Sequence, residues 1–462
     1  MDKRVLVLGL GRSGIAAANL LRDQRAHVVA FDQSTSPSLE QSAARLRERG
    51  IETRLAVSGV NEFSFDLVVT SPGIDPRQPL VQSLAERKIT VIGELELGYL
   101  LCPCPIIAIT GTNGKTTTTE LVDQVLRAGG KRTLAAGNIG HALCDAVRCD
   151  EPLDALSVEV SSFQLESIRS FHPRVSVLLN ITPDHLDRYN SLQDYASAKA
   201  RVFENQTADD FAVINADTIP QLTALGIRPV ARLITFSDRG GQADYRFQDG
   251  AIWRGGAKLL SITDTHLRGP HNAQNIMAAL AVAETMSVPL DAARRAVCEY
   301  RPRPHRCEFV ATVDGVDYIN DSKATNPDAV EKALAGMTRP VILIAGGKDK
   351  GFDFSALKPA IQAKVRRVIL IGETAPKLLQ CWGDVAICEC VTNFEAAVRA
   401  AQLSARQGNI VLLSPACSSF DMFKDFEDRG EQFKTIVRQL VNQTASAVSP
   451  SSQPKPKKGK HQ

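Results

Sequence analysis

The chain of 462 residues is too long for one hydrophobic core, because domains typically hold roughly 100–200 residues. A hydrophobic share of 44% and a charged share of 23% are typical of a globular protein, and aromatic residues supply only 5%. The net charge is +3, and part of it comes from Lys455, Lys457, Lys458 and Lys460 in the tail. The rest of the chain is close to neutral, which argues against a nucleic-acid-binding surface.

The N-terminus and the cysteines indicate a cytoplasmic protein. The first residues, MDKR, lead directly into an apolar strand at 5–8, without the longer apolar stretch of a secretory signal. The sequence contains no apolar run of about 20 residues. No transmembrane helix is therefore predicted, and no membrane partner is expected. The ten cysteines include two close pairs, Cys102/Cys104 and Cys388/Cys390, which have CxC spacing instead of the CxxC spacing of zinc sites. We expect reduced thiols.

The first segment alternates short apolar runs with helical stretches. Strands are predicted at 5–8, 28–31 and 67–69, with helices at 15–22 and 39–49. This order is typical of one half of a doubly wound parallel sheet.

A second series of elements begins with a strand at 106–109, a glycine-rich turn and a helix that ends near residue 128. Further buried strands are predicted at 156–158, 175–179 and 211–214. Between 234 and 262, short alternating stretches separated by glycine pairs predict antiparallel hairpins, so this sheet should be mixed at one edge. A helix is predicted at 272–286.

A third series follows the stretch Arg301-Pro302-Arg303-Pro304, which restricts the backbone and is typical of a linker. Strands are predicted at 340–345, 368–371 and 410–413. The last residues are rich in Ser, Pro, Lys and Gln and should be disordered. The sequence therefore predicts three α/β domains, at 1–93, 94–301 and 302–442, and a basic tail at 443–462.

A glycine-rich turn, Gly9-Leu10-Gly11-Arg12-Ser13-Gly14, follows the first strand and opens a helix. In that arrangement the glycines let backbone amides approach a pyrophosphate at a helix N-terminus. Asp32, at the end of the second strand, stands where a ribose is often bound. The pattern predicts a dinucleotide or diphosphate site, and a tight packing turn is the alternative.

A second phosphate-binding turn, Gly111-Thr112-Asn113-Gly114-Lys115-Thr116, lies between the strand at 106–109 and a helix. Its amides and Lys115 can hold ATP phosphates, while the Thr116 hydroxyl can reach Mg2+. The turn departs from the usual P-loop, because Ile109 occupies the position of the first glycine. Two such turns favour a reaction between a nucleotide-linked substrate and ATP over simple NAD chemistry.

Three further positions are candidates for the same chemistry. Glu159 follows the strand at 156–158, where a carboxylate can hold the metal of a bound nucleotide, although a solvated glutamate is the alternative. His185, between Asp184 and Asp187, is a candidate metal or substrate contact. Lys199 lies in a short helix, and its surroundings alone indicate no more than a surface charge.

Together these motifs resemble those of the Mur ligase family over nearly all of residues 1–440. The shared strings are Gly111–Thr116 continuing as Thr117-Thr118, Gly137–Gly140, Glu159–Gln164, Asn180–Asp187, Lys199, Gly269–Asn272 with Asn275, Pro304–Arg306 and Asp321–Lys323. The strings that resemble the D-glutamate-adding members are Ser71–Ile74, Asp321–Asn326, Gly346-Gly347 with Lys350, and Ser414–Ser419 running on to Phe426. Arg303 departs from the pattern, which has an apolar residue before Pro304.

The resemblance implies a three-domain α/β fold: an N-terminal Rossmann-like domain for a UDP-linked substrate, a central P-loop mononucleotide-binding domain with a mixed sheet, and a C-terminal Rossmann-like domain for an amino acid. It implies catalytic roles for Lys115, Glu159, His185 and Lys199. The residues implied for ATP are Gly111, Thr112, Asn113, Gly114, Lys115, Thr116, Thr117, Asn272, Arg306 and Asp321.

For the UDP-linked substrate, the implied residues are Gly11, Arg12, Ser13, Gly14, Asp32, Ser71, Gly73, Asn138, Gln164 and His185. Those implied for D-glutamate are Lys323, Thr325, Lys350, Ser419 and Phe426. Two Mg2+ ions would be held by Thr116, Glu159, His185 and Lys199, the last as a carbamate formed with CO2.

By the same resemblance, the enzyme adds D-glutamate to UDP-N-acetylmuramoyl-L-alanine in cytoplasmic peptidoglycan synthesis. We expect a monomer. A carboxylate is a poor electrophile, so ATP would first convert it to an acyl phosphate, which the amine attacks through a tetrahedral intermediate, leaving ADP and phosphate. The alternatives are another Mur-type ligase, a folylpolyglutamate synthase-like enzyme, an NAD-dependent oxidoreductase and a nucleotide-binding protein without catalysis.

Overall fold

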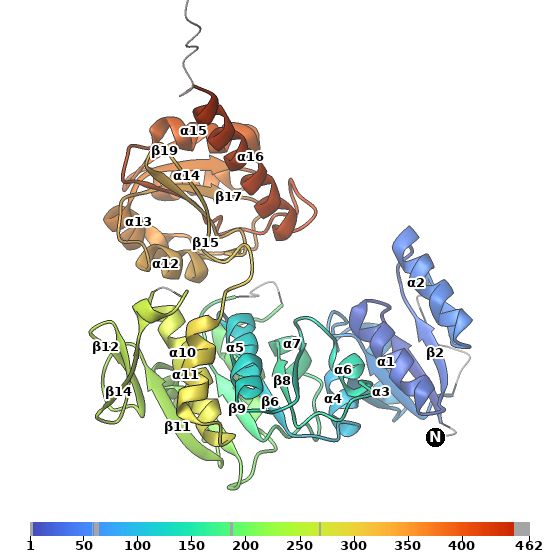
Figure 1. The fold of residues 1–462 in the computed structure, drawn as a ribbon. Coiled ribbons are helices and arrows are strands. Elements are labelled where there is room, and N and C mark those ends of the chain that lie inside the picture. Colours follow the sequence, from blue (N-terminus) through green and yellow to red (C-terminus); the bar gives the residue numbers. More distant parts are fainter. Residues whose placement is uncertain (1–2, 58, 60–63, 185–187, 268, 448–462) are drawn as a thin grey trace, which may run out of the picture. The chain divides into compact units, whose positions relative to one another are not determined.

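Three β-sheets organise the part of the chain that the structure describes (Figure 1). The computed structural model describes residues 3–57, 59, 64–184, 188–267 and 269–447. The chain separates after Arg301 into two compact units, residues 1–301 and 302–462. The division lies inside the predicted linker Arg301–Pro304, where two prolines restrict the backbone. The first unit contains two sheets and the second contains one.

The first sheet is parallel throughout and has the strand order β3-β2-β1-β4-β5. Its strands are β1 (Arg4–Leu8), β2 (His27–Phe31), β3 (Glu52–Arg54), β4 (Leu67–Thr70) and β5 (Thr90–Gly93), and its helices are α1 (Arg12–Asp23), α2 (Pro37–Glu48), α3 (Pro79–Glu86) and α4 (Glu94–Leu100). Successive side chains of a strand point to opposite faces. Val5 and Val7 therefore pack in the core with α1 and α2, and Leu6 and Leu8 pack in the core with α3. The short polar edge strand β3 was not predicted, because it lacks an apolar run.

The central sheet has the strand order β14-β13-β12-β11-β10-β9-β6-β8-β7. Its strands are β6 (Ile106–Thr110), β7 (Thr133–Gly137), β8 (Ala155–Glu159), β9 (Val175–Leu178), β10 (Phe211–Asn215), β11 (Arg232–Ser237), β12 (Tyr245–Gln248), β13 (Ala251–Arg254) and β14 (Ala257–Ser261). Strands from β7 to β12 in this order are parallel, whereas β12, β13 and β14 pair antiparallel. The predicted mixed edge is confirmed.

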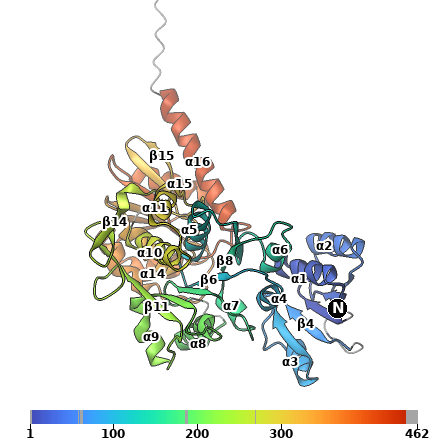
Figure 2. The same cartoon turned by 60° about the horizontal axis from the view of Figure 1, so that its bottom comes forward.

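Helices cover both faces of the central sheet. They are α5 (Lys115–Ala128), α6 (Leu143–Val147), α7 (Ser162–Leu165), α8 (Leu192–Ala200), α9 (Ile219–Ala224), α10 (Pro270–Thr285) and α11 (Leu290–Glu299). Ile107 and Ile109 pack in the core with α5, α10 and α11, which lie together in Figure 1. Ile106 and Ala108 pack in the core with α8 and α9, which lie on the other side of the strands in Figure 2. Burial on both faces explains why β6 is apolar throughout.

The second unit is built on a six-stranded sheet in the order β15-β16-β20-β17-β18-β19. Its elements are β15 (Glu308–Val313), β16 (Val316–Asn320), α12 (Pro327–Ala335), β17 (Val341–Gly346), α13 (Lys358–Lys364), β18 (Val365–Ile371), α14 (Ala375–Trp382), β19 (Ile387–Cys390), α15 (Phe394–Ser404), β20 (Ile410–Leu413) and α16 (Phe426–Ala447). The sheet is parallel except for β15, which pairs antiparallel with β16. This antiparallel edge was not predicted.

The last helix continues past the predicted start of the tail. The tail was predicted from residue 443, but α16 runs through Ala447. Adding a residue to an existing helix avoids the cost of nucleation, so the sequence QTASA can extend α16 although it could not start a helix. Residues 448–462, which contain the basic cluster, lie outside the described residues.

Candidate active site

A tight glycine-containing turn follows β6 and opens α5. Gly111 and Gly114 have φ values of 151° and 85°, which favour glycine. A Cβ on Gly114 would also lie 2.4 Å from Asn275 Oδ1. Backbone N–H groups at the start of α5 have no partner within the helix and carry its positive dipole end. The turn is therefore suited to bind an anion.

The Lys115 ammonium lies over this turn. Lys115 Nζ donates to the carbonyl oxygens of Gly111 and Thr112, at 2.9 and 2.8 Å. The side chain thus bends back across the loop from the first residue of α5. Its positive charge lies beside the amides that would face a phosphate.

Glu159 joins the turn to the neighbouring strand. It ends β8, which lies beside β6, and its carboxylate is buried. One oxygen accepts from Thr116 Oγ1 at 2.8 Å and the other from Asn138 Nδ2 at 2.9 Å. The structure therefore brings together a hydroxyl, a carboxylate and an amide. The hydroxyl and the carboxylate are oxygen ligands of the kind that Mg2+ prefers.

Lys199 is buried and reaches the same turn from α8. Only 1% of the residue is exposed, and its Nζ donates to the Gly111 carbonyl oxygen at 2.9 Å. The Nζ also lies 4.4 Å from the centre of the Tyr195 ring. Burial, followed by the nearby Lys115 charge, lowers the pKa of Lys199 well below its usual value. The surface-charge interpretation of Lys199 is therefore wrong, because α8 packs this residue inward.

On the other side of β6, Asn180 follows β9 and supports the turn. Asn180 Oδ1 accepts from the Asn113 N–H at 2.9 Å, and its Nδ2 donates to the Asn113 carbonyl at 3.1 Å. Thr112 Oγ1 donates to the Thr182 carbonyl at 3.1 Å and accepts from the Thr182 N–H at 3.0 Å. The predicted contact His185 lies outside the described residues.

The first turns of α10 and α5 are joined by a short polar chain. Thr118 Oγ1 donates to Asn275 Oδ1 at 3.2 Å, and Asn275 Nδ2 donates to Asn272 Oδ1 at 3.0 Å. The predicted adenine contact Asn272 is thereby connected to the helix that carries Lys115. Thr117, the last predicted ATP contact on α5, is buried.

The N-terminal glycine turn follows β1 and is held by two neighbouring strands. Asp32, after β2, accepts from the N–H groups of Leu10 and Ser34 at 2.7 and 2.9 Å. Ser71, after β4, donates to the Gly9 carbonyl at 2.9 Å. A Cβ on Gly14 would lie 1.7 Å from the Gly9 oxygen, so only glycine allows α1 to pack this closely.

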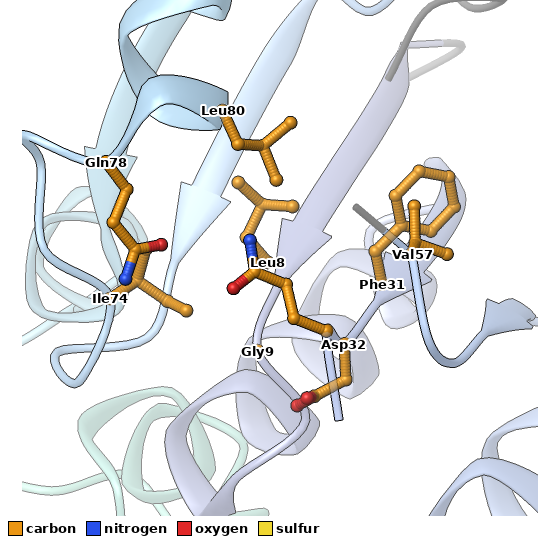
Figure 3. Close-up of a pocket in the computed structure, with 9 residues that line it drawn as sticks. Leu8, Gly9, Phe31, Asp32, Val57, Ile74, Gln78 and Leu80 are labelled. Atoms are coloured by element: carbon orange, nitrogen blue, oxygen red, sulfur yellow. The ribbon is translucent and has the colours of Figure 1, made fainter. Parts of the chain in front are cut away.

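A pocket opens beside this turn at the carboxyl ends of β1 and β2 (Figure 3). Its lining includes the backbone of Gly9, the apolar side chains of Phe31 and Ile74, and the polar side chains of Asp32 and Gln78. A mainly apolar lining with a few polar groups is typical of small-molecule sites. The remaining predicted residues of this region, Gly11, Arg12, Ser13 and Gly73, are exposed or half-buried.

The two α/β parts of the first unit meet near these turns. Arg12 Nη2 donates to the Asn138 carbonyl at 3.4 Å. Gln164, predicted to contact the substrate, is buried, and its Oε1 accepts from both the N–H and the hydroxyl of Ser161. Glu94 is fully buried at this joint, where one of its oxygens accepts from the Cys144 N–H at 2.7 Å. Burial raises the pKa of Glu94 to about 7.

In the second unit, four of the predicted D-glutamate residues lie on loops after its strands, and the fifth, Phe426, begins α16. Lys323 Nζ lies 3.8 Å from the centre of the Phe426 ring. The Thr325 N–H donates to the Lys323 carbonyl at 2.8 Å. Ser419 is buried and Lys350 is half-buried. The contact between Lys323 and Phe426 joins the loop after β16 to the start of α16.

Of the predicted ATP contacts in this unit, Asp321 is buried after β16 and Arg306 is half-buried. Asp321 accepts from Ser414 Oγ at 2.8 Å and from the Cys307 N–H at 3.1 Å. Burial raises the pKa of Asp321 to about 7. Arg303, which departs from the family pattern, is exposed.

The sequence offered no signal for Arg429, a buried arginine of α16. Its guanidinium donates to the hydroxyl and the carbonyl of Ser322, at 2.9 and 2.8 Å, and to the Cys417 carbonyl at 3.2 Å. These contacts tie the loop that carries Lys323 to the loop that carries Ser419. A charged residue in an amphipathic helix is usually exposed, so only the packing of α16 identifies this role.

Family models match most of the chain. The Mur ligase MurD-like N-terminal domain matches residues 3–93, the Mur ligase middle domain matches 109–283, and the Mur ligase glutamate ligase domain matches 305–417. This chain belongs to the Mur ligase family. The family has the predicted three-domain α/β fold, and that prediction is confirmed.

Relatives of similar length support the same assignment for this Mur ligase. The UDP-N-acetylmuramoylalanine–D-glutamate ligase of Geotalea uraniireducens is 42% identical over 446 residues, covering 95% of this chain and 98% of that protein. The enzyme of the same name from Koribacter versatilis is 41% identical over 447 residues, covering 96% and 98%.

Among solved structures, MurF from Acinetobacter baumannii aligns with a TM-score of 0.62 at 15% identity, covering 96% of this chain and 94% of that one. MurF ligase from Thermotoga maritima, solved in complex with ADP, aligns with a TM-score of 0.61 at 16% identity, covering 89% and 95%. These likenesses support the fold. Of the helices that the structure of this Mur ligase describes, none has the length and apolar character needed to cross a membrane.

Proposed function

We propose that this Mur ligase uses ATP to add D-glutamate to UDP-N-acetylmuramoyl-L-alanine in the synthesis of peptidoglycan precursors. The proposal rests on relatives of that name at about 40% identity over 95% of the chain. The NAD-dependent alternative leaves the second phosphate-binding turn without a purpose. The cytoplasmic location and the monomeric state stay predictions.

The observation that carries the chemistry is the convergence on Gly111. Both Lys115 Nζ and Lys199 Nζ lie 2.9 Å from its carbonyl oxygen, and Glu159 is hydrogen-bonded to Thr116 on the same turn. Two amines and a carboxylate therefore converge on one turn at the N-terminus of α5. This is the charge pattern that a reaction between an anionic acceptor and ATP needs.

We assign the triphosphate to the amides of 111–117, with Lys115 neutralising charge as the terminal phosphate leaves ADP. The acceptor is a carboxylate, so two anions must approach each other, and Lys115 lowers the cost of that approach. Mg2+, when bound, would supply further positive charge at the phosphate oxygens. We assign Thr116 and Glu159 to hold it, together with His185.

Lys199 is proposed to carry the CO2 adduct. Only a neutral amine can attack CO2, and burial beside Lys115 favours the neutral form of Lys199. Addition of CO2 forms a carbon–nitrogen bond and releases a proton, so the product carries one negative charge. That change would convert a buried neutral amine into a third oxygen ligand beside Glu159 and Thr116.

The UDP part of the acceptor is assigned to the N-terminal turn and its pocket. Gly11, Arg12 and Ser13 offer exposed or half-buried backbone at the start of α1 for the diphosphate, Gly14 is buried beside them, and Arg12 adds a positive charge. We assign the uracil ring to the side of the turn lined by Phe31, Asp32 and Ile74. Ser71, Gly73, Asn138 and Gln164 complete the proposed substrate set.

D-glutamate is assigned to the second unit, where Lys323 and Lys350 offer charges for its carboxylates. Thr325, Ser419 and Phe426 would shape the rest of that site. Arg306 and Asp321 are assigned to ATP, as is Asn272 in the first unit. The amine of D-glutamate would attack the acyl phosphate, and the tetrahedral intermediate would then collapse with loss of phosphate.

The deciding experiment measures phosphate release by the purified protein with ATP, Mg2+ and UDP-N-acetylmuramoyl-L-alanine. We expect release to depend on D-glutamate, with L-glutamate, L-alanine and meso-diaminopimelate close to background. Equal release with another amino acid would assign the chain to a different Mur ligase. Release without the UDP-linked acceptor, but with a folate, would favour the folylpolyglutamate synthase alternative.

A further inference from the structure

Two thiols lie close together in the connection between α4 and β6. Cys102 Sγ and Cys104 Sγ are 3.8 Å apart, and Cys102 Sγ is also 3.3 Å from the Cys104 carbonyl oxygen. Pro103 between them fixes one backbone angle and favours a turn. Both cysteines are half-buried, so small reagents can still reach them.

The chain contains a second CxC pair with a different geometry. Cys388 and Cys390 lie in β19, where residues two apart are separated by roughly 6.6 Å along an extended backbone. That separation is at the upper end of the range for a disulfide. Cys388 Sγ is directed to the Ala386 carbonyl at 3.6 Å instead. Identical spacing therefore places two sulfurs in contact at Cys102/Cys104 but not in the strand.

The two thiols of the Cys102/Cys104 pair have pKa values that are shifted in opposite directions. The Cys104 thiol can donate to Cys102, which lowers the pKa of Cys102 to about 7. The same interaction, followed by burial, raises the pKa of Cys104. One sulfur is thus available as a nucleophilic thiolate near neutral pH, and its neighbour remains a thiol.

We propose that Cys102 and Cys104 form a reversible thiol-oxidation site that closes to an intramolecular disulfide on reaction with a small-molecule disulfide such as oxidised glutathione. The Cys102 thiolate attacks one glutathione sulfur and breaks the sulfur–sulfur bond. This releases one glutathione thiolate, which takes up a proton. Cys104 loses its proton and attacks the Cys102 sulfur of the mixed disulfide, which releases the second glutathione. The protein loses two hydrogens, and one oxidised glutathione becomes two reduced molecules.

The site is distinct from the proposed phosphate chemistry. The pair precedes the first residue of β6, Ile106, whereas the phosphate turn follows the last residue of that strand. The five-residue strand therefore separates the two. A disulfide between Cys102 and Cys104 would restrict the connection that leads from the N-terminal sheet into the central sheet. Its formation can be measured without an assay of ligase activity.

The test uses the full-length reduced protein in glutathione buffers of increasing oxidised fraction at pH 7.5. Free thiols are labelled with N-ethylmaleimide, the protein is digested, and the peptide masses are measured by mass spectrometry. We expect the peptide with Cys102 and Cys104 to lose two hydrogens and accept no label, at an oxidised-glutathione fraction at least about tenfold lower than the Cys388/Cys390 peptide requires. Dithiothreitol should restore both labels.

Two variants separate the steps. In Cys104→Ser, a glutathione adduct on Cys102 should accumulate, because no second sulfur can displace it. In Cys102→Ser, Cys104 should stay unmodified under the same conditions. The proposal is overturned if both thiols of the natural protein remain fully labelled when the exposed Cys149 and Cys390 carry glutathione. It is equally overturned if Cys102 is recovered only as a glutathione adduct or in a disulfide between two molecules.

Discussion

The two glycine turns of the first unit are built in the same way but equipped differently. Each follows a central strand of a parallel sheet, and each is held by the first polar groups at the ends of the two flanking strands. Asp32 and Ser71 hold the turn after β1, whereas Glu159 and Asn180 hold the turn after β6. Parallel strands bring their carboxyl ends to one edge, so this arrangement follows from the fold.

The two turns differ in the charged side chains that surround them. Two lysines contact the carbonyl of Gly111 in the central turn, and a carboxylate is hydrogen-bonded to its threonine hydroxyl. In the N-terminal turn, Asp32 accepts from the backbone N–H of Leu10 within the turn and from that of Ser34 beside it, so its charge stabilises local structure. A glycine turn thus offers an anion site, and side chains from other elements decide between binding and phosphate chemistry.

The largest expected effect is on catalysis, where a substitution in each turn should change a different kinetic constant. Lys115→Ala should lower kcat for phosphate release by about 10²–10³-fold, because it removes a preorganised charge beside the phosphates. Arg12→Ala is the matched change in the other turn. It should raise KM for the UDP-linked substrate while leaving KM for ATP unchanged. Steady-state kinetics with each substrate varied would check both, and near-normal kcat in Lys115→Ala would remove the central turn from the mechanism.

Glu94, at the joint between the two parts, should make stability depend on pH. Its pKa is about 7 in the folded protein because of burial, and it is about 4.3 when the chain is unfolded. Between these values the folded state binds more protons, so the free energy of unfolding falls as pH rises from 4.3 to 7. The full loss, about 4 kcal/mol, is present above pH 7.

Glu94→Gln removes this ionisation and keeps an oxygen that can accept from the Cys144 N–H. The variant should therefore gain stability relative to the natural protein at pH 8 but not at pH 5, as measured by urea unfolding. An equal difference at both pH values would contradict the assignment of the buried carboxylate.

Lys199→Ala should lower ligase activity by at least about 100-fold, since it removes a proposed metal ligand. Millimolar formate or acetate should restore part of that activity, because a small carboxylate can occupy the vacated position. Lys131, a half-buried lysine after α5, is a matched control, and Lys131→Ala should have normal activity without added carboxylate. Full activity of Lys199→Ala would refute the carbamate proposal.

The smallest effect concerns the packing of the N-terminal turn. Gly14→Ala should destabilise the first unit by about 2 kcal/mol, because its Cβ collides with the Gly9 carbonyl oxygen. Gly11→Ala is the matched control, since a Cβ there meets nothing within 4 Å. Thermal unfolding of both variants would check this, and equal midpoints would show that the turn can relax.

Local patterns predicted most of the elements and the phosphate turns. The glycine spacing after an apolar strand indicated both anion sites, and the strand end at Glu159 indicated a carboxylate beside one of them. The antiparallel hairpins at 234–262 were also evident from alternation. In each case the signal lies within a few consecutive residues, because strand and turn formation depend on local backbone preferences.

Long-range packing was needed for the rest. Lys199 has the local sequence of a surface residue, but α8 buries it against Gly111. Arg429 joins two loops that are distant in sequence from each other, and the two CxC pairs share a spacing but not a backbone conformation. Burial and contact between distant segments depend on how sheets and helices assemble, and a residue's immediate neighbours in sequence do not record that assembly.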